Sequence, residues 1–221
     1  MTPRSRKRKL APADKAHIKR RKIYRKIRSA VLFLDCTVRS KEKCSEAEYL
    51  EKYMEIINHQ LRADNRKEVE FEVRRVYGSW KLLENLKYAD QYSIHISSHG
   101  DVAKNGRTYL DLSHGKLYAE DLESIWADFK KSERPLLLIL SACRAGHKDL
   151  IKALSRNGCR YCIAPVLDTN WEHAALFSTF FYTYLLLERM RPVTAFRRTV
   201  RTLPEVTGRW KMFDRGNEII V

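Results

Sequence analysis

Two short motifs in the chain carry the residue types that a cysteine nucleophile needs. Residues 136–146 (LLLILSACRAG) end an aliphatic run with Cys143, and residues 94–101 (IHISSHGD) end a second apolar run with His99 and Gly100. A thiolate attacks a carbonyl carbon far better than a thiol does, and a neighbouring imidazole can take the thiol proton. The oxyanion that forms needs backbone N–H donors, which Gly100 and the turn at Cys143 can offer. The pair predicts covalent catalysis on a carbonyl group.

Each motif also has an interpretation without catalysis. A free cysteine is often a small buried residue of a core, and a loop histidine can simply bond a backbone carbonyl. Cys143 and His99 can share one reaction only if the elements before them bring both to the same place. Glycine, alanine and serine surround both motifs, so a peptide backbone could approach them closely.

The apolar spacing along the chain predicts strands that alternate with helices. Strands are expected at residues 30–36, 68–76, 91–97, 135–141 and 160–166. Helices are expected at about 45–62, 79–88, 119–130, 147–157 and 171–188, and a β-hairpin at 106–118. The last twenty residues have no clear pattern, although GNEIIV could close the chain as a strand.

This order predicts an α/β fold with a mostly parallel central sheet, helices on both faces and a β-hairpin insertion. Sites in open parallel sheets form outside the carboxyl ends of the strands. Both chemical motifs stand at such ends, after the expected strands 91–97 and 135–141. If these two strands are neighbours, His99 and Cys143 face the same crevice.

The chain resembles the CHAT domain, a caspase-like cysteine peptidase family of the clan that includes caspases and separase. The resemblance covers about residues 30–200 and lies in four segments, IHISSHGD (94–101), LLLILSACRAG (136–146), YCIAPV (161–166) and HAALFSTFFYTYL (173–185). It implies that His99 is the catalytic histidine and Cys143 the nucleophile. It also implies that the backbone amides of Gly100 and Cys143 form the oxyanion hole, and that no metal ion or other cofactor takes part.

The resemblance further implies a protein substrate and a caspase-like cysteine endopeptidase. Such domains often act as regulated effectors, for instance in antiviral defence or cell death in bacteria. The chain lacks the sensor or repeat domains often fused to this family, so we expect a separate activating partner. The rival hypothesis is a non-catalytic, caspase-like interaction module with a basic tail that binds nucleic acid.

The residues that follow the strands leave the specificity open. Asp168 and Glu172 come after the fifth expected strand, where a carboxylate would favour Arg or Lys before the scissile bond. Arg39 follows the first strand and would favour an acidic residue instead. In the family a Trp and an acidic pair often follow the fifth strand, and residues 166–172 (VLDTNWE) match that pattern loosely. All three charges can equally be solvated surface groups.

The other histidines and cysteines have weaker patterns. We expect His95 to be packed inside the sheet, and His147, four residues after Cys143, is an alternative base. Cys159 and Cys162 have the spacing of a redox or metal pair, but residues three apart in a strand point to opposite faces. No further ligands with zinc spacing accompany them.

Charge divides the chain into two parts. Residues 1–28 hold thirteen Lys or Arg and one acid, whereas the other 193 residues carry a net charge of only +4 out of +16. We therefore expect a flexible basic tail at 1–28 and the peptidase domain at 29–221. Residues 4–28 could bind nucleic acid, rest on an anionic surface or acidic partner, or be a solubilising extension.

Location is also predicted from composition. The chain shows no apolar signal core near its start and no apolar run long enough for a transmembrane segment. Its five cysteines are an odd number, which favours free thiols. These features predict a cytoplasmic protein in a reducing environment.

Overall fold

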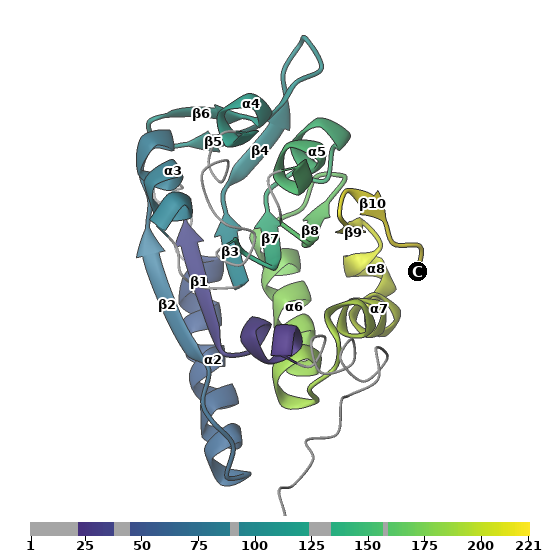
Figure 1. Cartoon of the computed structure of the whole chain (residues 1–221). Helices are drawn as coiled ribbons and strands as arrows, with labels where there is room; N and C mark the ends of the chain where they lie inside the picture. Colours follow the sequence, from purple (N-terminus) through teal and green to yellow (C-terminus); the bar gives the residue numbers. More distant parts are fainter. Residues whose placement is uncertain (1–21, 38–44, 89–92, 124–133, 157–158) are drawn as a thin grey trace, which may run out of the picture.

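The computed structural model describes residues 22–37, 45–88, 93–123, 134–156 and 159–221. A seven-stranded sheet forms its centre, with the strand order β10-β9-β8-β7-β3-β1-β2 (Figure 1). The first five of its strands along the chain are parallel and lie where the sequence predicts them, at β1 (Ala30–Asp35), β2 (Glu70–Arg75), β3 (Ser93–Ser97), β7 (Leu137–Ser141) and β8 (Tyr161–Pro165). The predicted α/β class is therefore confirmed.

Helices on both faces of the sheet bury the side chains of the central parallel strands. Every residue of β3, β7 and β8 is buried, and apart from His95 in β3 these strands consist of apolar and small residues. β2 lies at the sheet edge and alternates charged with apolar residues, and none of its residues is fully buried.

Helices cover both faces of the sheet. One face packs against α2 (Glu46–Ala63), α6 (Trp171–Tyr182), the π-helix η1 (Thr183–Leu187) and α7 (Pro192–Thr202). The other face packs against α3 (Ser79–Tyr88), α4 (Ala119–Glu123) and α5 (Lys148–Arg156). Alternate residues of β1 show this division, since Phe33 belongs to the first cluster and Leu34 to the second.

The predicted hairpin is present within a second, three-stranded antiparallel sheet. Its strands are β4 (His99–Val102), β5 (Thr108–Leu112) and β6 (Gly115–Tyr118). The sequence did not indicate β4, which continues the chain past the end of β3 (Figure 1). His99 and Gly100 therefore begin a strand and are held by its pairing with β5.

The carboxyl-terminal region holds elements that the sequence did not indicate, except that a short strand is present at residues 217–218, within the GNEIIV segment expected to close the chain as a strand. After α7 come α8 (Pro204–Thr207), β9 (Trp210–Asp214) and β10 (Asn217–Glu218), and β9 pairs antiparallel with β8. The predicted helix at 171–188 is divided into α6 and η1. The predicted helix at 119–130 is described only over α4, and its remainder lies outside the described residues.

The boundary expected at residue 28 also differs in detail. Residues 22–27 are helical, and Ile27 is fully buried in the cluster below α2 and α6. The end of the basic segment is thus packed on the domain, while residues 1–21 lie outside the described part. Within the described residues, no helix has the length and apolarity needed to cross a bilayer.

Candidate active site

The two motifs leave the central sheet side by side. β3 and β7 are adjacent and parallel, with Ser97 opposite Ser141 at their carboxyl ends. The Ser98 N–H then donates to the Ser141 carbonyl at 3.1 Å, so the chains stay paired as they leave the sheet. The condition set by the sequence, that these two strands be neighbours, is met.

Gly100 lies directly against the backbone of Cys143. A β-carbon at position 100 would be 2.5 Å from the Cys143 carbonyl oxygen and 3.3 Å from its nitrogen. Such distances leave no room for a side chain, which explains why glycine follows His99. The close contact fixes the start of β4 against the turn that holds the cysteine.

His99 and Cys143 line one small cavity of about 80 Å³. This volume suits the end of one side chain. Loops after four parallel strands and the first turns of two helices form its wall, with the lining residues Thr37, Glu46, Ser97, Ser98, His99, Ser141, Ala142, Cys143, Thr169, Asn170, Trp171 and Ala174. We call this hollow the dyad cavity.

The Cys143 thiol is bonded to the loop after β8. Its sulfur donates to the Thr169 carbonyl at 3.2 Å and accepts from the Thr169 N–H at 3.4 Å. The imidazole of His99 is exposed and has no hydrogen-bond partner among the described residues. Cys143 and His99 thus share a cavity without bonding to each other in this conformation. Within the same described part, the Cys143 N–H also has no acceptor.

The turn after Cys143 has an unusual backbone. Arg144 has φ +57°, in the left-handed region that residues with a β-carbon seldom adopt. Its guanidinium makes two bonds to Asp168, at 2.9 and 3.2 Å, and one to Asp101 at 3.2 Å. The hydrogen bond to Asp168 and the charges of both carboxylates raise the pKa of Arg144. Arg144 therefore joins the turn to the loop after β8 and to β4.

A buried carboxylate stands in the same cavity. Glu46, the first residue of α2, has a side chain only 1% exposed. Its Oε1 accepts bonds from the hydroxyls of Ser141 at 3.0 Å and Ser178 at 2.9 Å. Its Oε2 is buried and has no partner among the described residues. Glu46 is thus a carboxylate with one bonded and one free oxygen beside the cysteine motif.

His95 also approaches Glu46, since its Nε2 lies 3.2 Å from Oε1 of that carboxylate. The Tyr182 hydroxyl lies 3.1 Å from His95 Nδ1, and His95 Nε2 lies 2.8 Å from the Ser141 hydroxyl. Burial, followed by the Glu46 charge, raises the pKa of Tyr182, so this hydroxyl keeps a proton to donate. Tyr182, His95, Ser141 and Glu46 thus form one continuous buried network.

Comparison with known proteins identifies the family. The chain matches the CHAT domain over residues 5–210, nearly its whole length. It belongs to the CHAT domain family. No curated protein sequence matches it significantly. Among solved structures, this CHAT domain is similar to the inactive zymogen of a C11 protease from Parabacteroides distasonis, with a TM-score of 0.51 and 10% sequence identity. The similarity covers 85% of this chain but only 62% of that one, so it shows a shared fold.

Of the three charges considered for specificity, the two that the structure describes do not line the dyad cavity. Asp168 is engaged by Arg144 and does not line the dyad cavity. Glu172 is exposed in the first turn of α6 and is also absent from the cavity wall. Arg39 lies outside the described residues. Glu46 was not singled out from the sequence, where it is one of two acids at the start of an expected helix.

The three other thiols that the structure describes differ from Cys143. Burial raises the pKa of Cys36 and of Cys162, and it raises that of Cys159 to about 12. Cys159 donates to the Tyr161 carbonyl at 3.2 Å. No group of metal-binding side chains occurs in the part of the chain that the structure describes. These cysteines are core residues, whereas Cys143 is partly exposed.

The other described histidines do not line the dyad cavity. His95 is completely buried and hydrogen-bonded, as the sequence predicts for a packed histidine. His147 bonds to Asp149 at 3.0 Å and lines a different hollow, beside α4 and α5. Of the histidines that the structure describes, only His99 lines the dyad cavity.

Proposed function

We propose that this CHAT domain is a cysteine endopeptidase in which Cys143 is the nucleophile and His99 the base. The observation that carries the proposal is the dyad cavity, which both side chains line at the carboxyl edge of a caspase-like sheet. The fold is shared with a C11 protease in its inactive zymogen form. A peptidase of this kind acts on a protein substrate.

The reaction that fits these residues is acyl transfer. His99 takes the thiol proton, and the Cys143 sulfur bonds to the carbonyl carbon of the scissile peptide. The carbon–nitrogen bond breaks, and the amine leaves with the proton that His99 returns. Water then hydrolyses the thioester, with His99 again accepting a proton. The products are a carboxylate and an amine, and the free thiol is restored.

The oxyanion of each tetrahedral intermediate needs donors close to the sulfur. The Cys143 N–H meets this need because no acceptor occupies it among the described residues. The Gly100 amide is the second donor that the family resemblance implies. A β-carbon added at Gly100 would lie 3.3 Å from the Cys143 nitrogen, so the two backbones are close together. This closeness supports the use of both amides as donors to one oxyanion.

The described conformation is a resting one in this proposal. Thr169 holds the sulfur through both of its backbone polar groups, so the thiol cannot give its proton to His99 until this loop moves. Activation then requires a shift of the loop between β8 and α6. We propose that a separate partner causes this shift and that the protein is a regulated effector, for instance in bacterial defence or cell death.

The cavity supports a basic residue before the scissile bond. Of the described residues that line it, Glu46 is the sole carboxylate, and the remaining polar liners are hydroxyl and amide groups together with His99. A buried carboxylate with a free oxygen is costly unless a cation meets it. A Lys or Arg side chain that enters the dyad cavity would supply that cation.

Cleavage of a peptide library tests the function directly. Purified protein is incubated with the library, and the products are read by mass spectrometry beside Cys143→Ala, His99→Ala and His147→Ala. We expect the first two variants to lose cleavage and the third to keep it, because His147 lies outside the dyad cavity. A cysteine-directed probe tests the same pair whenever the loop between β8 and α6 leaves the sulfur, since labelling of Cys143 should then fall in His99→Ala.

The rival function predicts a different result. A non-catalytic module would leave every peptide intact and would give the same probe labelling in wild type and His99→Ala. It would also show salt-sensitive binding of DNA or RNA through residues 4–28. That combination would refute the peptidase.

A further inference from the structure

A second and larger hollow lies at the opposite end of the sheet. It has a volume of about 540 Å³ and is lined by Ser29, just before β1, and Val69, just before β2. The amino ends of these strands therefore border it, whereas the dyad cavity lies at the carboxyl ends. Five of its lining residues are basic: Arg25, Arg28, Arg66, Lys67 and Arg189. We call this hollow the basic pocket.

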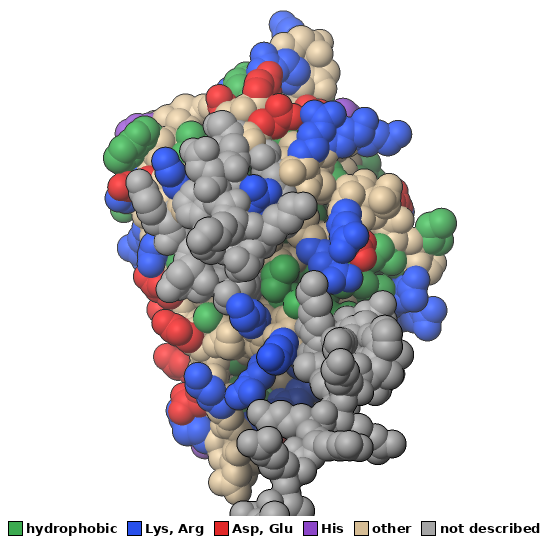
Figure 2. Space-filling model, viewed as in Figure 1, with side chains coloured by type: hydrophobic (Ala, Val, Ile, Leu, Met, Phe, Trp, Pro, Cys, Tyr) green, Lys and Arg blue, Asp and Glu red, His purple; other side chains and the backbone are tan. Residues whose placement is uncertain are grey.

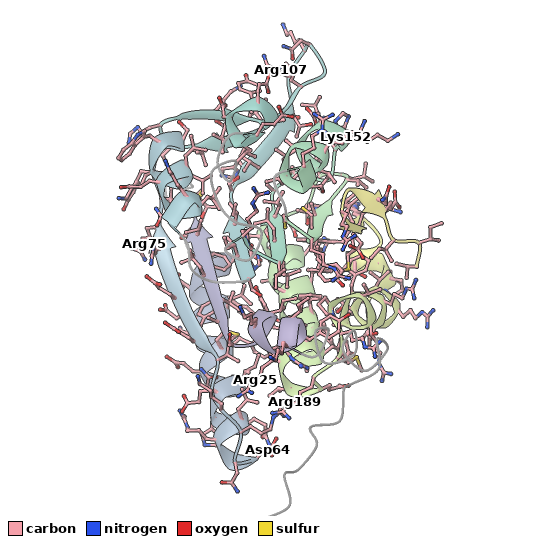
Figure 3. The ribbon with its side chains drawn as sticks, in the orientation of Figure 1. Arg25, Asp64, Arg75, Arg107, Lys152 and Arg189 are labelled. Carbon is pink, nitrogen blue, oxygen red and sulfur yellow. The ribbon has the colours of Figure 1, made fainter. Side chains whose placement is uncertain are left out.

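The figures show how these side chains gather. Arg25 and Arg189 lie close together near the lower end of the molecule, below the helical turns of residues 22–27 (Figure 3). Lys and Arg side chains cluster on the lower half of the same face in the space-filling view (Figure 2). They come from three separated parts of the chain, namely residues 22–28, the connection after α2, and the end of η1.

The nearby acids do not neutralise this cluster. Glu68 lines the pocket but bonds to Arg62 at 2.8 Å, outside the basic set. Asp64 approaches Arg66 at only 3.6 Å. Arg25, Lys67 and Arg189 have no carboxylate partner among the residues that the structure describes.

Backbone carbonyls hold two of the guanidinium groups in place without cancelling their charge. Arg28 donates to the carbonyls of Arg189 at 2.6 Å and Tyr24 at 3.1 Å. Arg66 donates to the carbonyls of Leu187 at 2.8 Å and Leu186 at 2.7 Å, and its Nε is buried without a partner. Burial, then the charges of Arg189 and Arg66, lower the pKa of Arg28. Arg28 and Arg66 are thus fixed and partly buried, and the other three basic residues of the pocket are exposed.

We propose that the basic pocket binds an anion carrying two or more phosphate groups. Guanidinium groups match phosphate oxygens in pairs, and fixed guanidinium groups lose little freedom when they bind. The volume lies in the usual range for small-ligand sites and exceeds what one phosphate fills. Leu61, Leu186 and Tyr24 give the pocket an apolar wall for the rest of the ligand. The phosphates belong to a free oligophosphate or nucleotide, or to a nucleic-acid strand.

The test measures binding by calorimetry on the full chain with Cys143→Ala, so that its result does not depend on peptidase activity. The ligands are tripolyphosphate, a nucleoside triphosphate and a short single-stranded oligonucleotide. The pocket variant Arg25→Gln/Arg189→Gln is compared with Lys152→Gln/Arg201→Gln, which removes the same charge from exposed residues that do not line the pocket.

We expect at least one ligand to bind about 30-fold or more weakly to the pocket variant and nearly normally to the control variant. If tripolyphosphate or the nucleotide shows this selective loss of binding, the natural ligand is a free oligophosphate or nucleotide. If only the oligonucleotide shows it, the ligand is a nucleic-acid backbone. Equal weakening in the two variants would assign the binding to the overall charge of the chain and overturn the proposal. No binding of any ligand at low salt would overturn it as well.

Discussion

Replacing Glu46 by glutamine removes the charge in the dyad cavity and keeps its shape. The amide oxygen of the new side chain can still accept from Ser141 and Ser178, so the change acts on the charge at the free Oε2 position. A hydrogen bond to a charged group contributes about 1.5–3 kcal/mol. At 1.4 kcal/mol per tenfold, the variant should react about 10- to 150-fold more slowly with a probe that presents arginine.

The assay is covalent labelling of Cys143 by two probes that differ only in one side chain. One probe carries arginine before the reactive group and the other carries citrulline, which has nearly the same shape without the charge. Wild type should prefer the arginine probe, and Glu46→Gln should lose that preference while its rate with citrulline changes little. Glu48→Gln is the matched control, since Glu48 lies in the same first turn of α2 but is exposed.

The control also separates specificity from stability. Both variants lose an acid near the amino end of a helix, which costs about 0.3–1 kcal/mol. A loss of Cys143 labelling that is equal in Glu46→Gln and Glu48→Gln therefore comes from the weakened helix end and not from a change in specificity. An arginine-to-citrulline rate ratio that is the same in wild type and Glu46→Gln would refute the assignment of Glu46 as the group that recognises the substrate cation.

Three further predictions concern the site and its support. Gly100→Ala should abolish Cys143 labelling and lower the free energy of unfolding by about 1–3 kcal/mol, because its β-carbon would be 2.5 Å from the Cys143 carbonyl oxygen. Urea melts measure the stability beside the control Gly78→Ala, a position that has room for a methyl group. A normal rate of Cys143 labelling in Gly100→Ala would contradict the prediction. Iodoacetamide should modify Cys143 in the native protein and spare the buried thiols until denaturant is added, as peptide mapping of Cys36, Cys159 and Cys162 would show; equal native rates would contradict this. Burial opposes ionisation of Asp149, but hydrogen bonds from Thr108, His147 and Leu150 outweigh it and hold the pKa of this carboxyl below its ordinary value of 3.8. The charge of Asp149 therefore stabilises the fold above pH 3.8, and this stabilisation is lost as the pH falls through the folded pKa. Asp149→Asn should therefore lower the Tm at pH 7 and have little effect near pH 2, and a constant Tm difference would oppose this.

Local patterns were sufficient for the parallel part of the sheet and for the two motifs at its edge. Strands buried on both faces are short apolar runs in sequence, so β1, β7 and β8 could be predicted from such runs, and β3 from Ile94 and Ile96 on one face. The place of His99 and Cys143 followed from the rule that sites form beyond the carboxyl ends of such strands. Both predictions depend on residues close together in the chain.

The features that escaped prediction depend on distant contacts. β9 is a strand because it pairs with β8, about fifty residues earlier, and its sequence WKMFD is short and mixed. Glu46 looks like an ordinary acid in the first turn of a helix. It becomes a buried carboxylate only because α6 brings Ser178 against it, 132 residues later in the chain.

Two long helices have an end at each hollow. α2 begins with Glu46 in the dyad cavity, and Leu61 in its last turn lines the basic pocket. α6 begins with Trp171 in the dyad cavity and continues through η1 to Leu186 in the basic pocket. Because an α-helix is stiff along its axis, an axial slide or tilt of either one displaces a wall of both hollows together. Only η1, whose wider turns interrupt the regular bonding of α6, can take up part of such a displacement.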